Sequence, residues 1–151
     1  MTALHVRRAG LDDLDALIEL YAQLNAERNV APRERLAAIL ADIVASDAFD
    51  VLVGTQDDRV VATCYLNVIP NLTRGGASYA VIENVVVDAA LRGTGLGRQV
   101  MQFALDEAWR RGCYKVLLQT GSRDPRVHRF YAACGFSASE KTGFVVRRPV
   151  N

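Results

Sequence analysis

A glycine-rich segment, Arg92–Gly97, has the residue types and the position needed to bind a phosphate group. It reads RGTGLG and lies between the apolar stretch VIENVVVD and a stretch with helical spacing. The first N–H groups of a helix lack intrahelical acceptors and lie at the positive end of the helix dipole, so they attract anions. Glycine has no Cβ to hold a phosphate away from the amides, and flanking arginines add charge-assisted hydrogen bonds. The predicted phosphate-contacting residues are Arg92, Gly93, Thr94, Gly95, Leu96, Gly97 and Arg98.

Two common nucleotide-binding motifs do not account for this segment. The Walker pattern G-x-x-x-x-G-K-[ST] is absent from the sequence. The Rossmann pattern G-x-G-x-x-G would need a glycine at Arg98 and an acidic residue at the end of the next strand, where residues 118–120 read LQT. A glycine-rich turn without a ligand remains the alternative interpretation.

Glu83 is a second candidate for chemistry because it lies in the stretch YAVIENVVV, where every neighbour except Asn84 is apolar. Burying a carboxylate is unfavourable unless it is paired or faces a cleft. A carboxylate in a cleft can take the proton from an amine that resembles a lysine side chain, which is mostly ammonium at neutral pH because its pKa is about 10. We therefore predict a general base at Glu83. A structural role, in which Glu83 holds a neighbouring loop or an arginine, is the alternative.

The spacing of apolar residues predicts one α/β domain over residues 1–151, built as a mixed sheet with helices on both faces. The stretch Tyr79–Val87 has almost no polar alternation, so we expect a central strand with both faces covered. The expected elements are a strand ended by Gly10, helices starting near Asp12 or Asp13 and at Pro32, a hairpin from Phe49 turning at Asp57-Asp58, the strand Tyr79–Val87, a helix over Gly95–Arg111, a strand over 114–120, a helix capped by Asp124, and a final strand pair over Phe136–Arg148.

Composition excludes several classes of protein. Charged residues make up 23% of the chain and the net charge is +1, which argues against disorder and against a nucleic-acid-binding surface. No apolar run reaches the roughly 18 residues of a membrane span, and the N-terminus lacks a signal-peptide core. Cys64, Cys113 and Cys134 indicate reduced core thiols in a cytoplasmic protein, with a cysteine nucleophile as the alternative. His5 and His128 are too scattered to bind a metal, and we predict none.

Three motifs together resemble the GNAT superfamily of acyl-CoA-dependent N-acetyltransferases. They are the strand ENVVVD, the pattern R-x-x-G-x-G at Arg92, Gly95 and Gly97, and FYAACGF over Phe130–Phe136. The resemblance implies a mixed, mostly antiparallel central sheet that is splayed around the acyl-CoA site, with helices on both faces. It also implies acetyl-CoA as cosubstrate, with its pyrophosphate on the amides of the glycine-rich segment.

The same resemblance implies roles for two further groups of residues. Backbone groups of Val85, Val86 and Val87 pair with the pantetheine arm of coenzyme A as if it were an added strand, a mode that suits an amide-bearing chain where neighbouring strands separate. Tyr131 lies where the family commonly has a tyrosine that protonates the departing thiolate. A phenol with a pKa near about 10 suits that step. The alternative is that Tyr131 belongs to the buried face of a short helix.

These features imply an enzyme that transfers an acetyl group from acetyl-CoA to a primary amine of a small molecule, by direct attack in a ternary complex. The joint presence of Glu83 and Tyr131 favours an enzyme over a non-catalytic module that binds acyl-CoA or a metabolite. A peptide or protein N-acetyltransferase is a further alternative. The sequence leaves open whether the protein forms a homodimer.

The sequence does not identify the amine. The segments IENVVVD and CYKV resemble glucosamine-6-phosphate N-acetyltransferases, which have an acidic pair at the position of Glu83-Asn84. Asn84 breaks that pair, so phosphosugar acetylation is one candidate among several. Arg74 and Lys115 would suit an anionic acceptor, with ordinary surface charge as the alternative. Acceptor selection is expected in the early helices and in the loop Pro70–Gly76, where the polar residues are Arg28, Asn29, Asn71 and Arg74.

Overall fold

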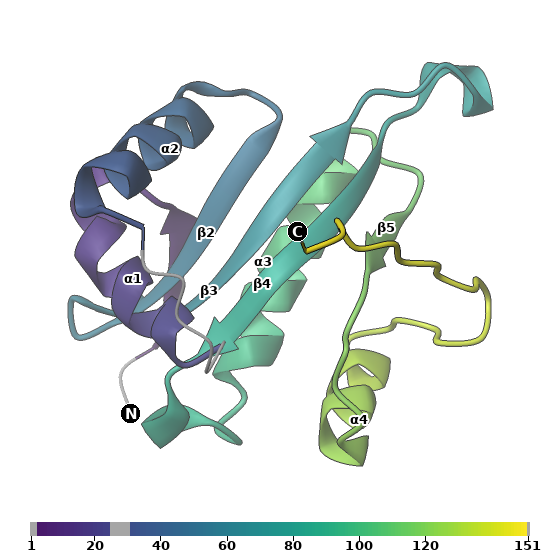
Figure 1. Cartoon of the computed structure of the whole chain (residues 1–151). Coiled ribbons are helices and arrows are strands. Elements are labelled where there is room, and N and C mark those ends of the chain that lie inside the picture. Colours follow the sequence, from purple (N-terminus) through teal and green to yellow (C-terminus); the bar gives the residue numbers. More distant parts are fainter. Residues whose placement is uncertain (1–2, 25–30, 151) are drawn as a thin grey trace. The chain divides into compact units, whose positions relative to one another are not determined.

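The computed structural model describes residues 3–24 and 31–150 of the chain. The chain divides into two compact units, a first unit that ends at Leu118 and a second unit that begins at Gln119. The prediction of a single domain stays a prediction. The elements (Figure 1) are β1 (His5–Arg8), η1 (Leu11–Asp13), α1 (Leu14–Ala22), α2 (Arg33–Ala45), β2 (Phe49–Gln56), β3 (Arg59–Ile69), η2 (Arg74–Gly76), β4 (Tyr79–Val87), η3 (Ala89–Leu91), α3 (Leu96–Arg110), β5 (Val116–Leu118) and α4 (Pro125–Ala133).

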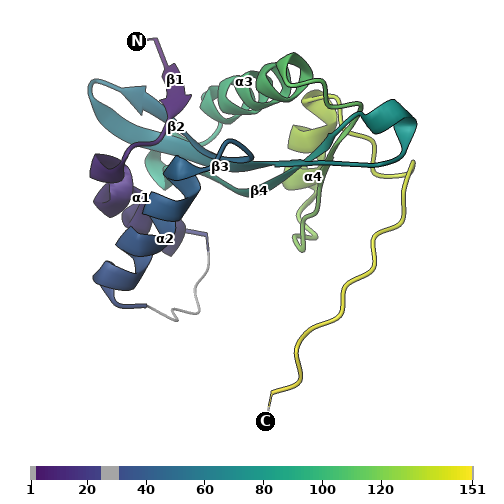
Figure 2. The same ribbon diagram turned by 90° about the horizontal axis from the view of Figure 1, so that it is seen from above.

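The strands of the first unit form one sheet with the order β1-β2-β3-β4-β5. Strands β1 to β4 pair antiparallel, and β5 pairs parallel with β4. Helix α1 contacts β3 and α2 contacts β2, whereas α3 contacts β3 and β4. Figure 2 shows α1 and α2 on one face of the sheet and α3 on the other. The predicted mixed, mostly antiparallel sheet with helices on both faces is therefore confirmed.

The β2–β3 hairpin turns at Asp57-Asp58, as predicted. Both residues have positive φ, 49° and 59°. A two-residue hairpin turn that matches the twist of its strands requires this conformation, and aspartate tolerates it better than most residues do. The turn sets which residues of β2 and β3 are paired. Strand β3 in turn pairs with β4, the strand that carries Glu83.

Alternate residues of β2 show which face of the sheet each helix covers. Val51 and Val53 are buried in one apolar cluster with Leu14 of α1. Gly54 faces the other way, since a Cβ at this position would lie 3.0 Å from Cγ2 of Val100 in α3. Val51 is paired with Tyr65 of β3, so Tyr65 lies on the face of α1 and α2. We call this the α1 face and the opposite one the α3 face.

A buried ion cluster fixes the C-terminal end of α3 to the sheet. The Asp50 carboxylate at the start of β2 is fully buried and contacts both Arg8 and Arg111. Arg111 also pairs with Glu107 of α3 at 2.7 Å. Hydrogen bonds from Arg110 and Arg111 lower the pKa of Glu107 to about 2. The cluster therefore anchors the helix whose other end carries the glycine-rich segment.

We expect Asp50→Ala to lower the free energy of unfolding by about 3 kcal/mol, because it removes the buried carboxylate shared by Arg8 and Arg111 and leaves the mostly buried Arg111 with Glu107 as its remaining partner. Urea unfolding followed by circular dichroism measures the change. The matched control is Asp15→Ala, which removes the exposed ion pair Arg33–Asp15 and should cost less than about 1 kcal/mol. Equal effects of the two substitutions would contradict an anchoring role for the cluster.

Two local predictions at the start of the helices need correction. Asp13 immediately precedes α1, but its carboxylate does not cap the helix: it accepts the N–H of Gly10 at 2.8 Å and pairs with Arg7 at 2.7 Å. An arginine competes successfully for the carboxylate because charge-assisted hydrogen bonds are the stronger ones. Pro32 lies at the cap position of α2, one residue before the predicted helical position.

The second unit contains α4, and there the predicted final strand pair is wrong. Residues 136–150 form no strand. Phe144 and Val146 are 90% and 97% exposed, although their types favour strands. Strand propensity describes how well a residue fits a pleated surface, and a strand needs a hydrogen-bonding partner that its own sequence does not supply.

Candidate functional site

The predicted phosphate-binding segment forms the entrance to α3. Gly95 is the cap residue with φ 88°, and Gly93 has φ 78°, a left-handed conformation that favours glycine. A Cβ at either position would meet nothing within 4 Å, so the backbone is accessible at both. The Thr94 hydroxyl donates to the carbonyl of Leu91 at 2.6 Å and closes the turn. The turn Gly93–Gly95 is exposed, whereas Leu96 and Gly97 at the start of α3 are buried, so the segment presents the turn that leads into α3 to solvent.

The two predicted arginines flank this turn and have different surroundings. The Arg92 Nε donates to the carbonyl of Val87 at 3.1 Å, which ties the glycine-rich segment to the end of β4. Arg98 is exposed on the first turn of α3. Both cations lie within three residues of Gly95 and add to the positive potential of the helix N-terminus.

A β-bulge at Asn84 interrupts β4. Asn84 has φ 52°, and the register with β3 shifts between Thr63 and Tyr65. Asparagine is one of the few residue types that adopt this left-handed conformation readily. Pairing with β5 covers Ala80 to Ile82 and ends just before the bulge. Beyond Ile82 this edge of β4, here called the open edge, pairs with no strand among the described residues.

The bulge also decides which backbone groups of β4 point to the open edge. The N–H of Asp88 donates to the carbonyl of Val61 at 2.8 Å, so Asp88 points toward β3. Backbone direction alternates along a strand, which turns the main-chain groups of Val85 and Val87 toward the open edge and those of Val86 toward β3. The open edge thus offers the main-chain groups of Val85 and the N–H of Val87 to an added extended chain, while the Val87 carbonyl already accepts from Arg92 Nε at 3.1 Å.

Glu83 lies directly before the bulge and is exposed. It is paired with Tyr65 of β3, so its side chain lies on the α1 face. The prediction that both faces of β4 are covered is wrong for Glu83 and Asn84, which are exposed. The reason is that β5 stops pairing at Ile82, while α1 and α2 contact mainly β2 and β3. The carboxylate is therefore accessible to a substrate.

Register brings further side chains to the same face as Glu83. Val81 is paired with Leu117, so both lie on the α1 face. Tyr79 lies two residues before Val81 on β4 and therefore on the same face. The Lys115 ammonium lies 5.3 Å from the centroid of the Tyr79 ring. The β4–β5 face, defined by Tyr79, Val81, Glu83, Lys115 and Leu117, combines one carboxylate and one ammonium with apolar surface.

Tyr131 belongs to the second unit, which is described by itself. It lies on α4, which begins after Asp124, whose carboxylate accepts the N–H of Arg126 at 2.8 Å as the predicted cap. The Tyr131 ring is half-buried and lies 5.1 Å from Phe130 and 6.3 Å from Phe136 between centroids. The structure thus places Glu83 and the glycine-rich segment in one unit and Tyr131 in the other.

Other kinds of site find little support. Burial raises the pKa of the Cys64 thiol to about 12 and also raises the pKa of Cys113, so neither is a ready nucleophile. No group of three or more potential metal ligands is present among residues 3–24 and 31–150. Across the same residues, no helix has the length and apolarity to cross a membrane. Arg28 and Asn29 lie outside the described residues.

Sequence reasoning missed the bulge at Asn84 and the position of Tyr65 opposite Glu83, and it named Arg74 and Lys115 as candidates for an anionic acceptor without relating them to Glu83. The left-handed turn at Asn84 has only a weak signal, an asparagine in a β-branched stretch. Tyr65 and Lys115 have no signal relative to Glu83, since only the register of β3 and β5 with β4 brings them to its face. The loop residue Arg74 is placed in the same way, through its contact with Tyr114.

Comparison with known proteins points to one family. The model of the acetyltransferase (GNAT) family matches residues 14–136, which include the glycine-rich segment, Glu83 and Tyr131. A protein of Oryza sativa subsp. japonica named as a glucosamine 6-phosphate N-acetyltransferase is 35% identical over 140 residues, which is 89% of this chain and 82% of the rice protein.

Solved structures agree with the sequence comparison. A protein of Agrobacterium tumefaciens named as an acetyltransferase is 43% identical, with a TM-score of 0.90 over 95% of this chain and 99% of its own. Glucosamine-6-phosphate N-acetyltransferase from Arabidopsis thaliana is 26% identical, with a TM-score of 0.82 over 99% of each chain.

Proposed function

Because the chain belongs to the acetyltransferase (GNAT) family, a family of acyltransferases, we propose that it transfers the acetyl group of acetyl-CoA to a primary amine of a small molecule. One observation carries the proposal: the open edge of β4 begins beside the exposed Glu83 and leads to the glycine-rich segment at the start of α3. A carboxylate, an unpaired strand edge and an anion-binding turn thus follow one another within residues 83–98.

Acetyl-CoA fits the backbone features of the first unit. It supplies an activated acetyl thioester. Its pyrophosphate is proposed to lie on the N–H groups of Thr94–Arg98, where the open Cβ positions of Gly93 and Gly95 allow a close approach. Arg92 and Arg98 add charge-assisted contacts.

The pantetheine arm is proposed to extend β4 along its open edge. The alternating direction of main-chain groups along β4 supports Val85 and Val87 for this pairing more directly than Val86. The main-chain groups of Val85 and Val87 point away from β3. Strand β5 pairs with β4 only as far as Ile82. The amides of the arm then continue the pairing of this edge beyond that residue.

Glu83 is proposed to be the general base. Its carboxylate takes a proton from the ammonium of the acceptor, directly or through water, and so produces a neutral amine. The amine nitrogen forms its bond to the acetyl carbon as the C–S bond breaks, with both substrates bound together. Attack leaves a positive charge on the nitrogen, which loses its second proton as the amide forms. Tyr131 is proposed to donate its phenolic proton to the departing sulfur and to recover a proton from that nitrogen, directly or through water, while the proton on Glu83 returns to solvent. The products are then the neutral amide, the thiol of coenzyme A and one released proton.

Glucosamine 6-phosphate is the first acceptor to test, because the rice and Arabidopsis relatives are named for it. A panel of amines incubated with acetyl-CoA, with free thiol as the readout, tests the proposal. Thiol release with at least one small amine supports it. Binding of acetyl-CoA without thiol release from any amine or peptide would favour a non-catalytic module, and release with peptides alone would favour a peptide N-acetyltransferase. A cytoplasmic location and a homodimer remain predictions.

We expect Gly95→Val to abolish measurable binding of acetyl-CoA, because the new side chain would occupy the position proposed for the pyrophosphate. Calorimetry measures the affinity. The matched control is Gly112→Val at the other end of α3, where φ is 73° and a Cβ also meets nothing within 4 Å. Both variants carry the same kind of backbone strain, roughly 1 to 2 kcal/mol. Unchanged affinity in Gly95→Val, or equal loss in both variants, would contradict a phosphate site at Gly95.

A further inference from the structure

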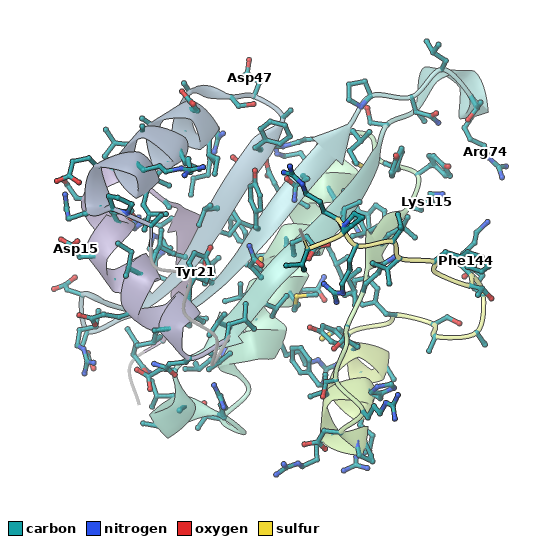
Figure 3. The ribbon with its side chains drawn as sticks, viewed as in Figure 1. Asp15, Tyr21, Asp47, Arg74, Lys115 and Phe144 are labelled. Atoms are coloured by element: carbon teal, nitrogen blue, oxygen red, sulfur yellow. The ribbon has the colours of Figure 1, made fainter. Side chains whose placement is uncertain are left out.

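Two cations and two phenol rings meet where β4 and β5 begin. The Arg74 guanidinium carbon lies 5.5 Å from the ring centroid of Tyr114. The Lys115 ammonium lies 5.2 Å from the same ring and 5.3 Å from that of Tyr79. Figure 3 labels both cations, which come from the β3–β4 loop and from the segment before β5. These cation–π contacts hold two flexible side chains in place.

The positive charge of Arg74 and Lys115, here called the cation pair, is not neutralised by the described chain. The ion pairs formed by the described residues involve other side chains, so neither cation has a carboxylate within 4.0 Å among them. Hydrogen bonding from Lys115 lowers the pKa of the Tyr114 phenol, and Arg74 acts in the same direction. A phenol responds in this way to a local positive potential.

The loop that carries Arg74 is held by its own side chains. The Asn71 amide donates to the carbonyl of Ala77 at 3.3 Å and to the Thr73 hydroxyl at 2.9 Å. These bonds join the two ends of the loop between β3 and β4. Arg74 is therefore presented from an ordered turn rather than from a free chain.

Lys115 lies on the same side of the sheet as the proposed base, and Arg74 is placed beside Lys115 by their shared contact with the ring of Tyr114. Val116 is paired with Ala80, which is fully buried, so the adjacent Lys115 points to the opposite α1 face with Glu83. Tyr79, beside Lys115, and Glu83 are four residues apart on β4, which separates their Cα atoms by about 13 Å. That span leaves room between the two side chains for an acceptor of monosaccharide size.

We infer that Arg74 and Lys115 bind an anionic group of the acceptor, a phosphate or a carboxylate, while the amine of the same molecule lies at Glu83. The inference deepens the proposed function and rests on it. It makes the cation pair a determinant of acceptor choice, since an unpaired cation stabilises an anionic ligand and contributes little to a neutral one. Tyr79 and Tyr114 serve as the platform that positions both cations.

The test compares Lys115→Met and Arg74→Gln with the parent protein. The amines are glucosamine 6-phosphate, glutamate and glucosamine, which offer a phosphate, carboxylates and no anionic group. We expect each substitution to lower the ratio of kcat/KM for the preferred anionic amine to that for glucosamine by about tenfold to a hundredfold. The loss should come mainly from KM, with unchanged affinity for acetyl-CoA. Arg59→Gln, an exposed arginine at the other end of β3, is the matched control and should leave the ratio unchanged.

The outcomes separate the inference from the proposed function. Turnover with no preference for anionic amines, or a preference that survives both substitutions, would overturn the inference and leave acetyl transfer standing. If no amine is turned over, calorimetry with glucosamine 6-phosphate, glutamate and inorganic phosphate decides. If one of these anions binds the parent protein but not Lys115→Met, the anion site is supported and acetyl transfer is contradicted. If none of them binds, or if binding survives both substitutions, the inference is overturned. Glucosamine 6-phosphate preferred over glutamate identifies the phosphate as the recognised group, and the reverse identifies the carboxylate.

Discussion

We expect Tyr131→Phe to lower the rate of the acetyl-transfer step by roughly 10² to 10⁴-fold, the range seen when a general acid is lost. The substitution keeps the ring, and with it the contacts to Phe130 and Phe136 at centroid distances of 5.1 and 6.3 Å. It removes only the proton that the thiolate needs as it departs. Thermal stability and acetyl-CoA affinity should therefore change little. Single-turnover rates, melting temperature and calorimetry together measure the effect.

The opposite pattern would assign Tyr131 to structure. If its hydroxyl only satisfies a hydrogen bond within the protein, losing it costs about 1 kcal/mol of stability and leaves the rate nearly intact. Fluorinated tyrosine at position 131 provides a second measurement, because fluorine lowers the pKa of a phenol without removing its proton. A general acid predicts that the alkaline limb of the pH–rate profile shifts to lower pH, whereas a structural residue predicts no shift.

We expect Glu83→Gln to lower turnover by about 10²-fold while acetyl-CoA binding stays intact, if Glu83 is the only base. Glutamine matches the size of glutamate but does not take a proton from the amine. The deficit should be largest at low pH, where more of the acceptor is ammonium and each turnover needs a base. As the pH rises toward the pKa of the amine, which is about 10 for a lysine-like acceptor and about 8 for an α-amino group, the deficit should shrink. The pH dependence of kcat/KM measures both effects.

Asp106→Asn is the matched control for Glu83→Gln. Asp106 is an exposed carboxylate on α3, where it accepts a hydrogen bond from Gln102 at 2.9 Å. Its loss changes the net charge equally and should leave turnover unchanged. Parallel pH profiles of Glu83→Gln and the parent would remove Glu83 from the mechanism and leave it a structural role on the β4–β5 face.

The local elements of this protein follow from the sequence alone. The strand Tyr79–Val87 has the predicted bounds, the helix after the glycine-rich segment begins at Leu96 within one residue of its predicted start, and Asp57-Asp58 forms the predicted hairpin turn. These features depend on apolar period, on capping and on which residues tolerate positive φ. Each depends on residues within a few positions along the chain, so the sequence contains the whole signal.

The chemically important surroundings of Glu83 were decided by the tertiary structure. Its exposure, the open edge of β4 and the arrival of Lys115 on its face all depend on where β5 stops pairing and on the bulge at Asn84. The anchoring contact of Asp50 with Arg111 joins residues 61 positions apart. The absence of strands in residues 136–150 has the same origin, since strand propensity requires a partner.

The sequence by itself therefore determined which groups are available: a glycine-rich helix start, a carboxylate in a strand and a tyrosine on a short helix. Only the tertiary structure decided that Glu83 faces solvent and that Lys115 shares its side of the sheet. The physical reason is the two-residue period of a strand, by which a single inserted residue at Asn84 reverses the direction of every following backbone group. Such a shift has a large effect on the site and almost no local signature in the sequence.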